Sequence, residues 1–422
     1  MQSEKEYLTV ADALKNVLAG IDVLPAEEVP LLDALGRVLA EPVVAQDSLP
    51  PFANSSMDGY AVRADDIATA CLQTPVTLRV IAGIAAGIEP QVEVKPGTAV
   101  RIMTGAPLPP GADAIVPVED TNEPWRNEER PLPSQIKIHR VVQPGDYVRN
   151  VGEDIRAGQI ILRETHILRP QEVGVLASLG VSRIQVIRRP RVAVLATGDE
   201  LLPIDAPLQP GKIRNSNGYT QVSQVKALGG VPIFLGIAKD TESDVRARLQ
   251  AGIDAGIDLF VSSAGVSVGA YDVVKSVLMQ DGVVGFWRVR MRPGKPLAFG
   301  SYAGIPYLGL PGNPVSAMVS FERFARAAIL KMAGHQALDR PTVPVILQDS
   351  ISSDGRESYV RAVVSRSETG EYVATTTGSQ GSHIMTSLVK ANALLIVPEG
   401  VTSVNPGSQL SAWMIDWPET VF

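Results

Sequence analysis

The amino-acid sequence predicts a multidomain α/β plus β fold, built around a central, doubly wound, mostly parallel sheet. The first observation is length, because 422 residues exceed the roughly 150 residues of a typical domain. The second is an alternation of strand and helix patterns between residues 190 and 335, which is typical of parallel sheets covered by helices. The third is a set of short period-two segments on either side of that region, which indicates two β domains.

The region before the first β domain is expected to be helical and extended. Thr9 followed by Asp12 resembles a capping box, and apolar residues between 14 and 21 fall on one helix face. A second helix is expected at about 31–39. Period-two alternation then predicts the strands of a small β domain at 76–80, 99–102, 114–116 and 136–138. A short helix with proline at its start and glycine at its end is expected at 170–180.

The central region is expected to supply most of the helices. Strands are predicted at 191–196, 231–237, 258–262, 284–289 and 305–308, and helices at 217–228, 243–251, 271–279 and 314–332. Short strands return at 343–347, 359–364, 372–376 and 393–397. Four domains are therefore expected: an elongated N-terminal and linking domain (1–46 and 141–175), a small β domain (47–140), an α/β domain (176–335) and a C-terminal β domain (336–422).

Composition excludes several classes of protein. Lys and Arg total 38 against 45 Asp and Glu, and this net charge of −7 argues against a nucleic-acid binder. No run of about 18 apolar residues predicts a membrane span, and the polar, acidic start of the chain argues against a signal peptide. The single cysteine, Cys71, excludes an intramolecular disulfide and any cysteine-based metal cluster. A soluble, cytoplasmic protein is expected.

The turns that follow the predicted strands carry the candidate chemistry, since ligands of open α/β sheets bind beyond the carboxyl ends of the strands. Much of the excess of Gly (37) and Pro (32) lies in these turns. Their carboxylates are Asp199, Glu200, Asp240 and Asp272, and their cations include Arg292 and Lys295. Each turn alone is equally well explained as a simple turn. Together they indicate a magnesium-dependent site for a phosphate ester.

Other common sites are not indicated. The chain has no G-x-x-x-x-G-K-[ST] loop, no G-x-G-x-x-G after a strand and no G-x-S-x-G elbow, and its four histidines lack metal-ligand spacing. Three polar segments lie outside the α/β region, at 54–62, 101–107 and 375–383, and their composition alone favours surface loops. The hydroxyls of the last segment, with Arg361 on a nearby strand, suit a tetrahedral oxyanion.

Eight motifs run in order along nearly the whole chain. They are Ser-Met-Asp-Gly-Tyr-Ala-Val (56–62), Arg-Ile-Met-Thr-Gly-Ala (101–106), Gly-Glu-Asp-Ile (152–155), Thr-Gly-Asp-Glu-Leu (197–201), Gly-Val-Ser-Val-Gly (265–269), Pro-Gly-Lys-Pro (293–296), Leu-Pro-Gly-Asn-Pro-Val-Ser (310–316) and Gly-Ser-Gln-Gly-Ser-His (378–383). With this ordered set the sequence closely resembles the molybdopterin molybdenumtransferases, the MoeA-type molybdenum insertases that include the C-terminal domain of gephyrin.

The resemblance implies a molybdopterin-binding type of α/β domain in an elongated homodimer. The implied reaction takes adenylylated molybdopterin and molybdate, inserts molybdenum with Mg²⁺, and releases AMP. The implied site lies between the α/β and C-terminal domains of one subunit and the small β domain of the other. Molybdopterin adenylyltransferase and apo-molybdoenzymes are the candidate protein partners. Binding to a nucleic acid or to a membrane is not expected.

The resemblance also assigns residues motif by motif. The implied catalytic residues are Asp58, Thr104, Glu200, Asp240 and Asp272, with Glu200 and Asp272 as the metal ligands. The implied substrate-binding residues are Gly265, Ser267, Gly269, Arg288, Arg292, Pro311 and Pro314. The implied molybdate residues are Lys295, Pro296, Ser316, Arg361 and Ser382.

Some features depart from the family pattern or leave alternatives open. Arg288 and Arg292 stand where the family often has lysine, which keeps the charge and changes the donor geometry. Ala264 replaces a common glycine, and Ala270-Tyr271 alters the approach to Asp272. Tungstate remains an alternative to molybdate. A molybdopterin adenylyltransferase and a gephyrin-like, non-catalytic scaffold remain the alternative functions.

Overall fold

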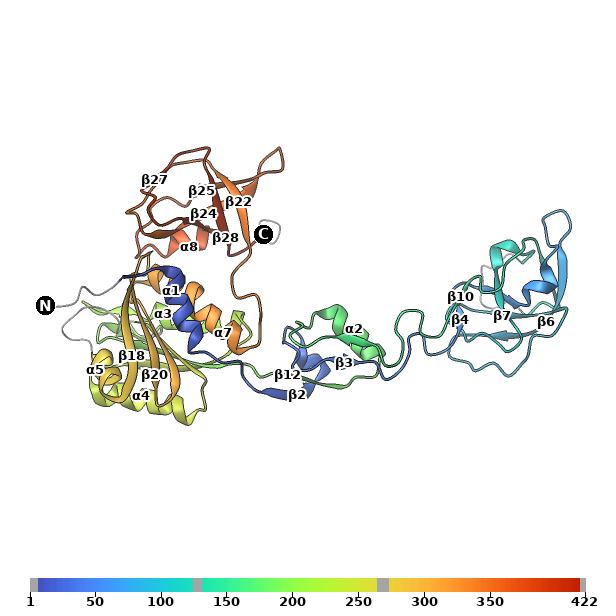
Figure 1. The fold of residues 1–422 in the computed structure, drawn as a ribbon, viewed down its shortest axis with the longest axis horizontal. Helices are drawn as coiled ribbons and strands as arrows, with labels where there is room; N and C mark the ends of the chain where they lie inside the picture. Colours follow the sequence, from blue (N-terminus) through green and yellow to red (C-terminus); the bar gives the residue numbers. More distant parts are fainter. Residues whose placement is uncertain (1–6, 124–130, 264–272, 418–422) are drawn as a thin grey trace. The chain divides into compact units, whose positions relative to one another are not determined.

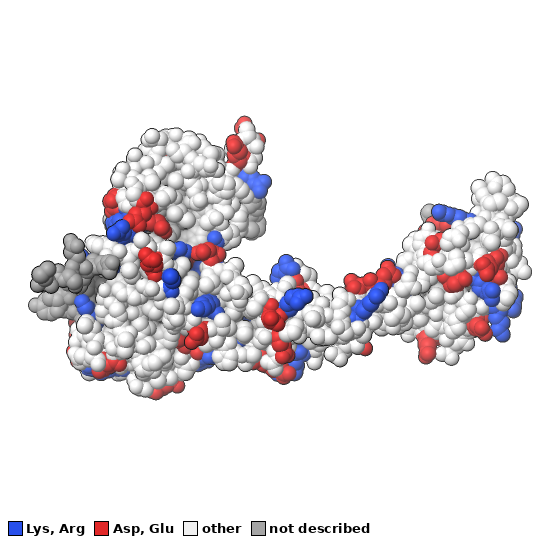
Figure 2. Space-filling view, viewed as in Figure 1, with Lys and Arg blue, Asp and Glu red and all other residues white. Residues whose placement is uncertain are grey.

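The computed structural model describes residues 7–123, 131–263 and 273–417. The chain forms two compact units, which can be followed by colour in Figure 1. The large unit comprises Met1–Val29, Ala34–Ala40 and Gln185–Phe422, and the small unit comprises Pro30–Asp33 and Glu41–Ile184. Figure 2 shows acidic and basic side chains interspersed on the visible face of each unit. Within the described ranges, no helix combines the length and the apolar character that crossing a membrane requires.

A seven-stranded sheet forms the centre of the large unit, in the order β1-β18-β20-β21-β17-β13-β16. Its strands are β1 (Tyr7–Leu8), β13 (Arg191–Thr197), β16 (Val231–Ala238), β17 (Leu259–Ser263), β18 (Gly282–Val289), β20 (Pro296–Tyr302) and β21 (Ile305–Leu310). Neighbouring strands are parallel except at β20, which runs antiparallel to β18 and β21. The predicted mostly parallel sheet is confirmed.

Helices cover both faces of this sheet (Figure 1). They are α1 (Val10–Ala19), α3 (Ser216–Ala227), α4 (Glu242–Asp254), α5 (Val273–Asp281), α6 (Pro314–Ser320) and α7 (Arg326–Met332). Successive residues of a strand face opposite sides. Val192 and Val194 therefore pack with residues of α1, α6 and α7, whereas Ala193 and Leu195 pack with residues of α4 and α5. Burial on both faces explains why β13 is an unbroken apolar run.

Two local predictions about helices are confirmed. The hydroxyl of Thr9 accepts a hydrogen bond from the backbone amide of Asp12 and donates one to its carboxylate, so this pair caps α1. The predicted helix at 314–332 is continuous from α6 through a π-helical turn (Phe321–Ala325) into α7.

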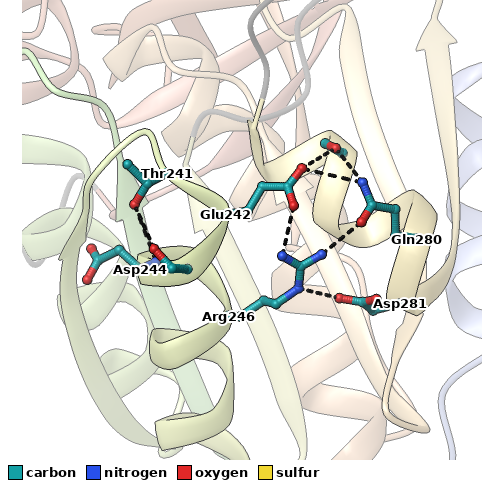
Figure 3. Close-up of polar contacts among 8 residues, drawn as sticks. Thr241, Glu242, Asp244, Arg246, Gln280 and Asp281 are labelled. Atoms are coloured by element: carbon teal, nitrogen blue, oxygen red, sulfur yellow. Dashed lines mark hydrogen bonds and ion pairs between the residues drawn. The ribbon is translucent and has the colours of Figure 1, made fainter.

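A polar network joins α4 to α5 (Figure 3). Thr241 caps α4, and Arg246 projects from its second turn. The Arg246 guanidinium donates to Glu242 at 2.8 Å, to Asp281 at 2.7 Å and to Gln280 at 2.9 Å. The bond to Glu242 lies within α4, whereas the bonds to Asp281 and Gln280 hold α5 against α4.

The C-terminal part of the large unit is a small barrel. Its sheet has the order β19-β24-β25-β22-β28-β26, and an additional pairing of β24 with β26 closes it. The strands are β19 (Met291–Arg292), β22 (Thr342–Leu347), β24 (Glu357–Arg366), β25 (Tyr372–Thr376), β26 (Ala393–Val397) and β28 (Gln409–Met414). Helix α8 (Thr386–Lys390) and the pairs β14 (Leu201–Leu202) with β15 (Ile213–Arg214) and β23 (Ile351–Ser352) with β27 (Ser403–Val404) complete the unit.

The small unit contains a five-stranded sheet in the order β8-β5-β7-β6-β9. The strands are β5 (Gly59–Val62), β6 (Val76–Ile84), β7 (Thr98–Ile102), β8 (Ala114–Pro117) and β9 (Gln135–Ile138). Two apolar clusters pack on its faces. The unit also holds α2 (Pro170–Ser178) and the pairs β3 (Val43–Val44) with β11 (Ile160–Leu162) and β4 (Asn54–Ser55) with β10 (Val148–Arg149). Strands β2 (Ala26–Pro30) and β12 (Arg183–Ile187) contain residues at which the chain passes between the units.

The predicted second helix at 31–39 is wrong. The structure has one 3₁₀ turn, Leu31–Ala34, and Gly36 then adopts a φ of 75°, which ends helical geometry. The sequence analysis also missed β1, β20 and β28. The four predicted domain boundaries remain predictions.

We expect Arg246→Ala to loosen α5, because it removes the two hydrogen bonds from Arg246 on α4 to Asp281 and Gln280 on α5. Hydrogen exchange of the backbone amides of 273–281 should become faster, while exchange in β22 should not change. Arg248→Ala is the matched control, since Arg248 lies on α4 but donates to the carbonyl of Leu235. Equal effects of the two variants on α5 would contradict this role of Arg246.

Candidate active site

The carboxyl ends of three parallel strands lie level at one edge of the central sheet. In register, Ala196 of β13 pairs with Ser263 of β17, which in turn pairs with Leu310 of β21. The turns that follow these strands line a cleft of about 1000 Å³. Its lining residues are Thr197, Glu200, Leu201, Ile213–Asn217, Ser263, Arg292–Pro296, Pro311–Pro314, Ser316, Arg356 and Gln380–His383.

Positive charge dominates this cleft. Four basic side chains line it, namely Arg214, Arg292, Lys295 and Arg356. Among the described lining residues, Glu200 is the one carboxylate. Hydroxyl groups come from Thr197, Ser216, Ser263, Ser316 and Ser382. A cleft of this size and charge suits a phosphate-bearing small molecule.

The carboxylate of Glu200 lies beside the backbone of Gly198, just after the end of β13. Gly198 has a φ of 140°, and a Cβ placed on it would lie 2.3 Å from a carboxylate oxygen of Glu200. Glycine is favoured at position 198 because other residues are strained at this φ, and a Cβ there would also displace the Glu200 carboxylate. The Thr-Gly-Asp-Glu turn thus aims one carboxylate into the cleft.

The barrel supplies the opposite side of the cleft. The carbonyl of Ser382 accepts a 3.1 Å hydrogen bond from the backbone amide of Val315 in the first turn of α6. This bond brings the 378–383 segment next to Ser316, which is buried. The predicted molybdate residues Lys295, Pro296, Ser316 and Ser382 all line the cleft, as do the predicted substrate residues Arg292, Pro311 and Pro314.

Arg361 lies in a smaller adjoining pocket of about 110 Å³, which shares Arg292, Pro293 and Gln380 with the cleft. Its side chain is 1% exposed. It donates to the Ser387 hydroxyl at 3.0 Å and to the Gly381 carbonyl at 3.1 Å. Burial, with a smaller contribution from the charge of Arg292, lowers the pKa of Arg361 to about 10.

Arg361 therefore stays charged at neutral pH without a carboxylate partner among the described residues. Burying a charge without a counter-charge is unfavourable. An anion in the small pocket would relieve this, and the pocket is large enough for a small oxyanion but not for a nucleotide.

One carboxylate outside the cleft lining arranges two of the cations. Asp354 bonds to Arg356 at 2.5 Å and lies 3.9 Å from Arg292. The Arg356 guanidinium, followed by its backbone amide, lowers the pKa of Asp354, with a smaller contribution from the charge of Arg292. Asp354 thus stays ionised and positions both guanidinium groups at the cleft.

Asp240 holds two turns together in this structure. Its carboxylate accepts from the backbone amide of Asp199, and the Asp199 carboxylate accepts from the backbone amide of Asp240, both at 3.2 Å. Neither Asp199 nor Asp240 is among the described residues that line the cleft. The catalytic role predicted for Asp240 remains a prediction, and these contacts show it as a support for the Glu200 turn.

The predicted pair in the small unit is in direct contact. One carboxylate oxygen of Asp58 accepts from the backbone amide of Thr104 at 2.7 Å and from its hydroxyl at 2.8 Å. The next residue must be glycine, because a Cβ on Gly59 would lie 2.0 Å from the carbonyl oxygen of Val116. Thr104 therefore fixes the Asp58 carboxylate and leaves its second oxygen without a bond to Thr104.

Several predicted residues are not in the cleft or not described. Gly265, Ser267, Gly269 and Asp272, with the departures Ala264 and Ala270-Tyr271, lie outside the described residues. Arg288 lies in β18 opposite Tyr7. Arg214 and Arg356 also line the cleft but were not predicted as site residues, because no clear sequence pattern marks the turns that precede them. The polar run Arg214-Asn215-Ser216-Asn217 was the available signal, and the Asn217 amide indeed donates to the carbonyl of Gly312 at 2.6 Å.

The predicted metal pair can be tested in part. Glu200 lines the cleft, and Asp272 is not described. In the described ranges, no three His, Cys, Asp or Glu side chains gather to hold a metal ion. Mg²⁺ commonly binds one or two carboxylates and completes its shell with water and substrate phosphates. A single cleft carboxylate therefore fits a magnesium ion that binds together with a phosphate-bearing substrate.

Comparison with known proteins agrees with this architecture. Three family models match in order: the MoeA N-terminal region (domain I and II) at 8–180, a probable molybdopterin binding domain at 193–331, and the MoeA C-terminal region (domain IV) at 344–415. The crystal structure of the molybdopterin biosynthesis MoeA protein from Pyrococcus horikoshii OT3 is 31% identical, with a TM-score of 0.79 over 97% of this chain and 100% of that one.

Two curated relatives extend the similarity. Molybdopterin molybdenumtransferase 2 of Mycobacterium tuberculosis is 40% identical, covering 98% of this chain and 99% of its own. Molybdopterin molybdenumtransferase of a Nostoc species is 38% identical, covering 95% and 91%. The fold and the cleft thus define a protein with a molybdopterin-binding α/β domain and the MoeA domain architecture. The chain belongs to the molybdopterin molybdenumtransferase family.

We expect Gly198→Ala to lower the free energy of unfolding by about 1–3 kcal/mol, because a non-glycine residue is strained at this φ. In a Glu200→Ala background the loss should be smaller, since the truncated side chain no longer meets the new Cβ. Gly370→Ala is the control, because Gly370 also has a positive φ but faces open space. Urea unfolding measures all four variants. An equal loss in both backgrounds would show that Glu200 does not lie over Gly198.

Proposed function

We propose that this chain is a transferase of molybdenum cofactor biosynthesis that inserts molybdenum from molybdate into molybdopterin. The observation that carries the proposal is the cleft in which four cations face one carboxylate, joined to a small pocket that holds a buried arginine. The names of the curated relatives support it. We further propose that the molybdopterin is adenylylated, that AMP is released, and that Mg²⁺ is required.

The two spaces suggest a division of labour. The large cleft has the volume and the charge for an adenylylated pterin, whereas the small pocket has room for a single oxyanion. Molybdate is a tetrahedral dianion, which guanidinium, ammonium and hydroxyl donors bind well. We assign to molybdate Arg361 in the small pocket, together with Lys295, Pro296, Ser316 and Ser382, which line the adjoining cleft. Tungstate has nearly the same shape and charge and is an equally good ligand for these donors.

Glu200, together with Asp272, is proposed to hold Mg²⁺ at the substrate phosphates. The ion would neutralise charge on the phosphate oxygens as AMP leaves. The residues of this chain do the remaining work: Arg292 and Arg356 orient the anionic substrate, and Asp354 keeps both guanidinium groups in place. Gly265, Ser267 and Gly269 are proposed to contact the substrate.

The first prediction is that the protein releases AMP from adenylylated molybdopterin and Mg²⁺ only when molybdate is added. Chelation of Mg²⁺ should stop the release. Consumption of ATP with free molybdopterin would instead indicate an adenylyltransferase. If the folded protein shows neither activity, the result would favour the non-catalytic scaffold function.

The second prediction separates the two spaces. Arg361→Ala should raise the molybdate concentration for half-maximal AMP release by about tenfold or more, since a hydrogen bond to a charged group contributes about 1.5–3 kcal/mol. Glu200→Gln should instead lower the maximal rate and shift the Mg²⁺ dependence. Arg361→Lys is a second variant that keeps the positive charge, in case Arg361→Ala does not fold. Arg366→Ala, an exposed arginine on the same strand, is the control. Equal effects on molybdate and Mg²⁺ dependence would contradict the division of labour.

We also propose that the active form is a homodimer, with Asp58 and Thr104 acting on the substrate bound to the partner subunit. Asp58→Asn and Glu200→Gln should each have only a small fraction of wild-type activity alone. After denaturation and refolding together, about a quarter of wild-type activity should return, because half of the dimers are mixed and each has one intact site. No recovery would place both carboxylates in sites of the same subunit.

A further inference from the structure

An aromatic side chain at the edge of the central sheet has no part in the function proposed above. β1 pairs in parallel with β18, which places Tyr7 opposite Arg288. The backbone amide of Arg290 donates to the carbonyl of Leu8 at 2.8 Å and anchors this short strand. Leu8 packs against the main apolar cluster, and Tyr7 faces the other way, as alternation along a strand requires. The position of Tyr7 is therefore set by the core and by the sheet.

Two cations lie against the ring of Tyr7. The Lys295 ammonium is 5.2 Å from the ring centroid, and the Arg288 guanidinium carbon is 5.9 Å from it. Both distances fall within the range of about 6 Å for cation–π attraction. A hydrogen bond with Lys295 is the largest influence on the Tyr7 hydroxyl, and with the charge of both cations it lowers the pKa of Tyr7.

The two cations share another property. Within the described part of the chain, no ion pair joins Lys295 or Arg288 to a carboxylate, whereas Arg292 and Arg356 both have Asp354. Two cations at one ring repel each other, and the negative face of the ring offsets this repulsion only in part. The arrangement therefore lacks a negative charge, and Lys295 lines the cleft that we assign to anionic substrates.

We propose that Tyr7 is a positioning residue, whose ring holds Lys295 and Arg288 together as a paired site for one tetrahedral oxyanion at the cleft. This inference deepens the proposed function, because the oxyanion is either molybdate or a phosphate of the nucleotide. It also gives Arg288 a role, although Arg288 is not among the described residues that line the cleft. Lys295 is the cation of the pair that lines the cleft, and Arg288 contributes its charge from beside the same ring.

The test is direct binding of molybdate and of AMP, each measured by calorimetry on the full chain. Tyr7→Leu removes the ring and should weaken binding of one of the two anions about two- to sixfold, the range expected for an exposed cation–π contact. The anion that is weakened identifies the ligand. Tyr7→Phe keeps the ring and removes the hydroxyl that bonds to Lys295, and we expect its affinity to lie within about twofold of wild type. A loss as large as that of Tyr7→Leu would overturn the role of the ring. Rescue by phenylalanine assigns the effect to the ring and not to the hydroxyl.

Tyr372→Leu is the matched control, because Tyr372 also packs under an arginine, Arg366, at 5.2 Å, but in a strand of the barrel outside the cleft lining. It should leave both affinities unchanged. A double-mutant cycle adds a readout that a purely structural role would not move. In a Lys295→Ala background, Tyr7→Leu should cause little further loss of affinity.

Unchanged affinities in Tyr7→Leu, or the same loss with and without Lys295, would overturn the inference. Either result with normal molybdate-dependent AMP release would leave the proposed function intact. The opposite outcome is also distinguishable. If the wild-type protein releases no AMP but Tyr7→Leu still weakens anion binding, the paired site is supported and the insertion reaction is rejected.

Discussion

The parallel pairing of β13, β17 and β21 is the constraint on which the cleft depends. Parallel strands end at the same edge of a sheet, so turns that are more than a hundred residues apart in sequence meet there. The pairing also buries both faces of the sheet, which requires helices on each side and leaves the strand ends as the exposed surface where polar side chains can gather. The glycine and proline residues of these turns shape the backbone around a ligand and do not serve as flexible linkers.

A second principle is that the site is built around charges that the chain itself leaves unbalanced. Asp354 compensates Arg292 and Arg356, but Arg361 is buried without such a partner among the described residues. Stability alone would favour a carboxylate or an apolar residue in its place. Retaining the cation is reasonable if an anion arrives from outside, which connects the energetics of the barrel with the chemistry of the cleft.

Much of the fold was predictable, because β13, β16 and β17 are apolar runs and α3 and α4 follow them at regular spacing. Strand β20 was missed since Pro296 begins it, and a proline after a turn does not look like a strand start. The prediction of a helix at 31–39 was wrong because it rested on apolar spacing alone. Gly36 adopts a left-handed conformation that ends helical geometry. At the site, the motif residues were predictable, but Arg356 and Tyr7 were not. Arg356 reaches the cleft because β24, which follows it, pairs with β19, and Tyr7 reaches Lys295 because β1 pairs with β18. No local pattern encodes either pairing.

The pairing of β1 with β18 also has a consequence for synthesis of the chain. Tyr7 and Arg288 are 281 residues apart. At about 5–20 residues per second, a ribosome needs roughly 14–56 s to make the intervening polypeptide. During that interval β1 has no strand to pair with, and the edge of the sheet cannot form. Nascent chains that stall before β18 emerges carry an unpaired β1. The cleft is completed later still, because its lining includes Arg356 and residues 380–383, which are made after β18.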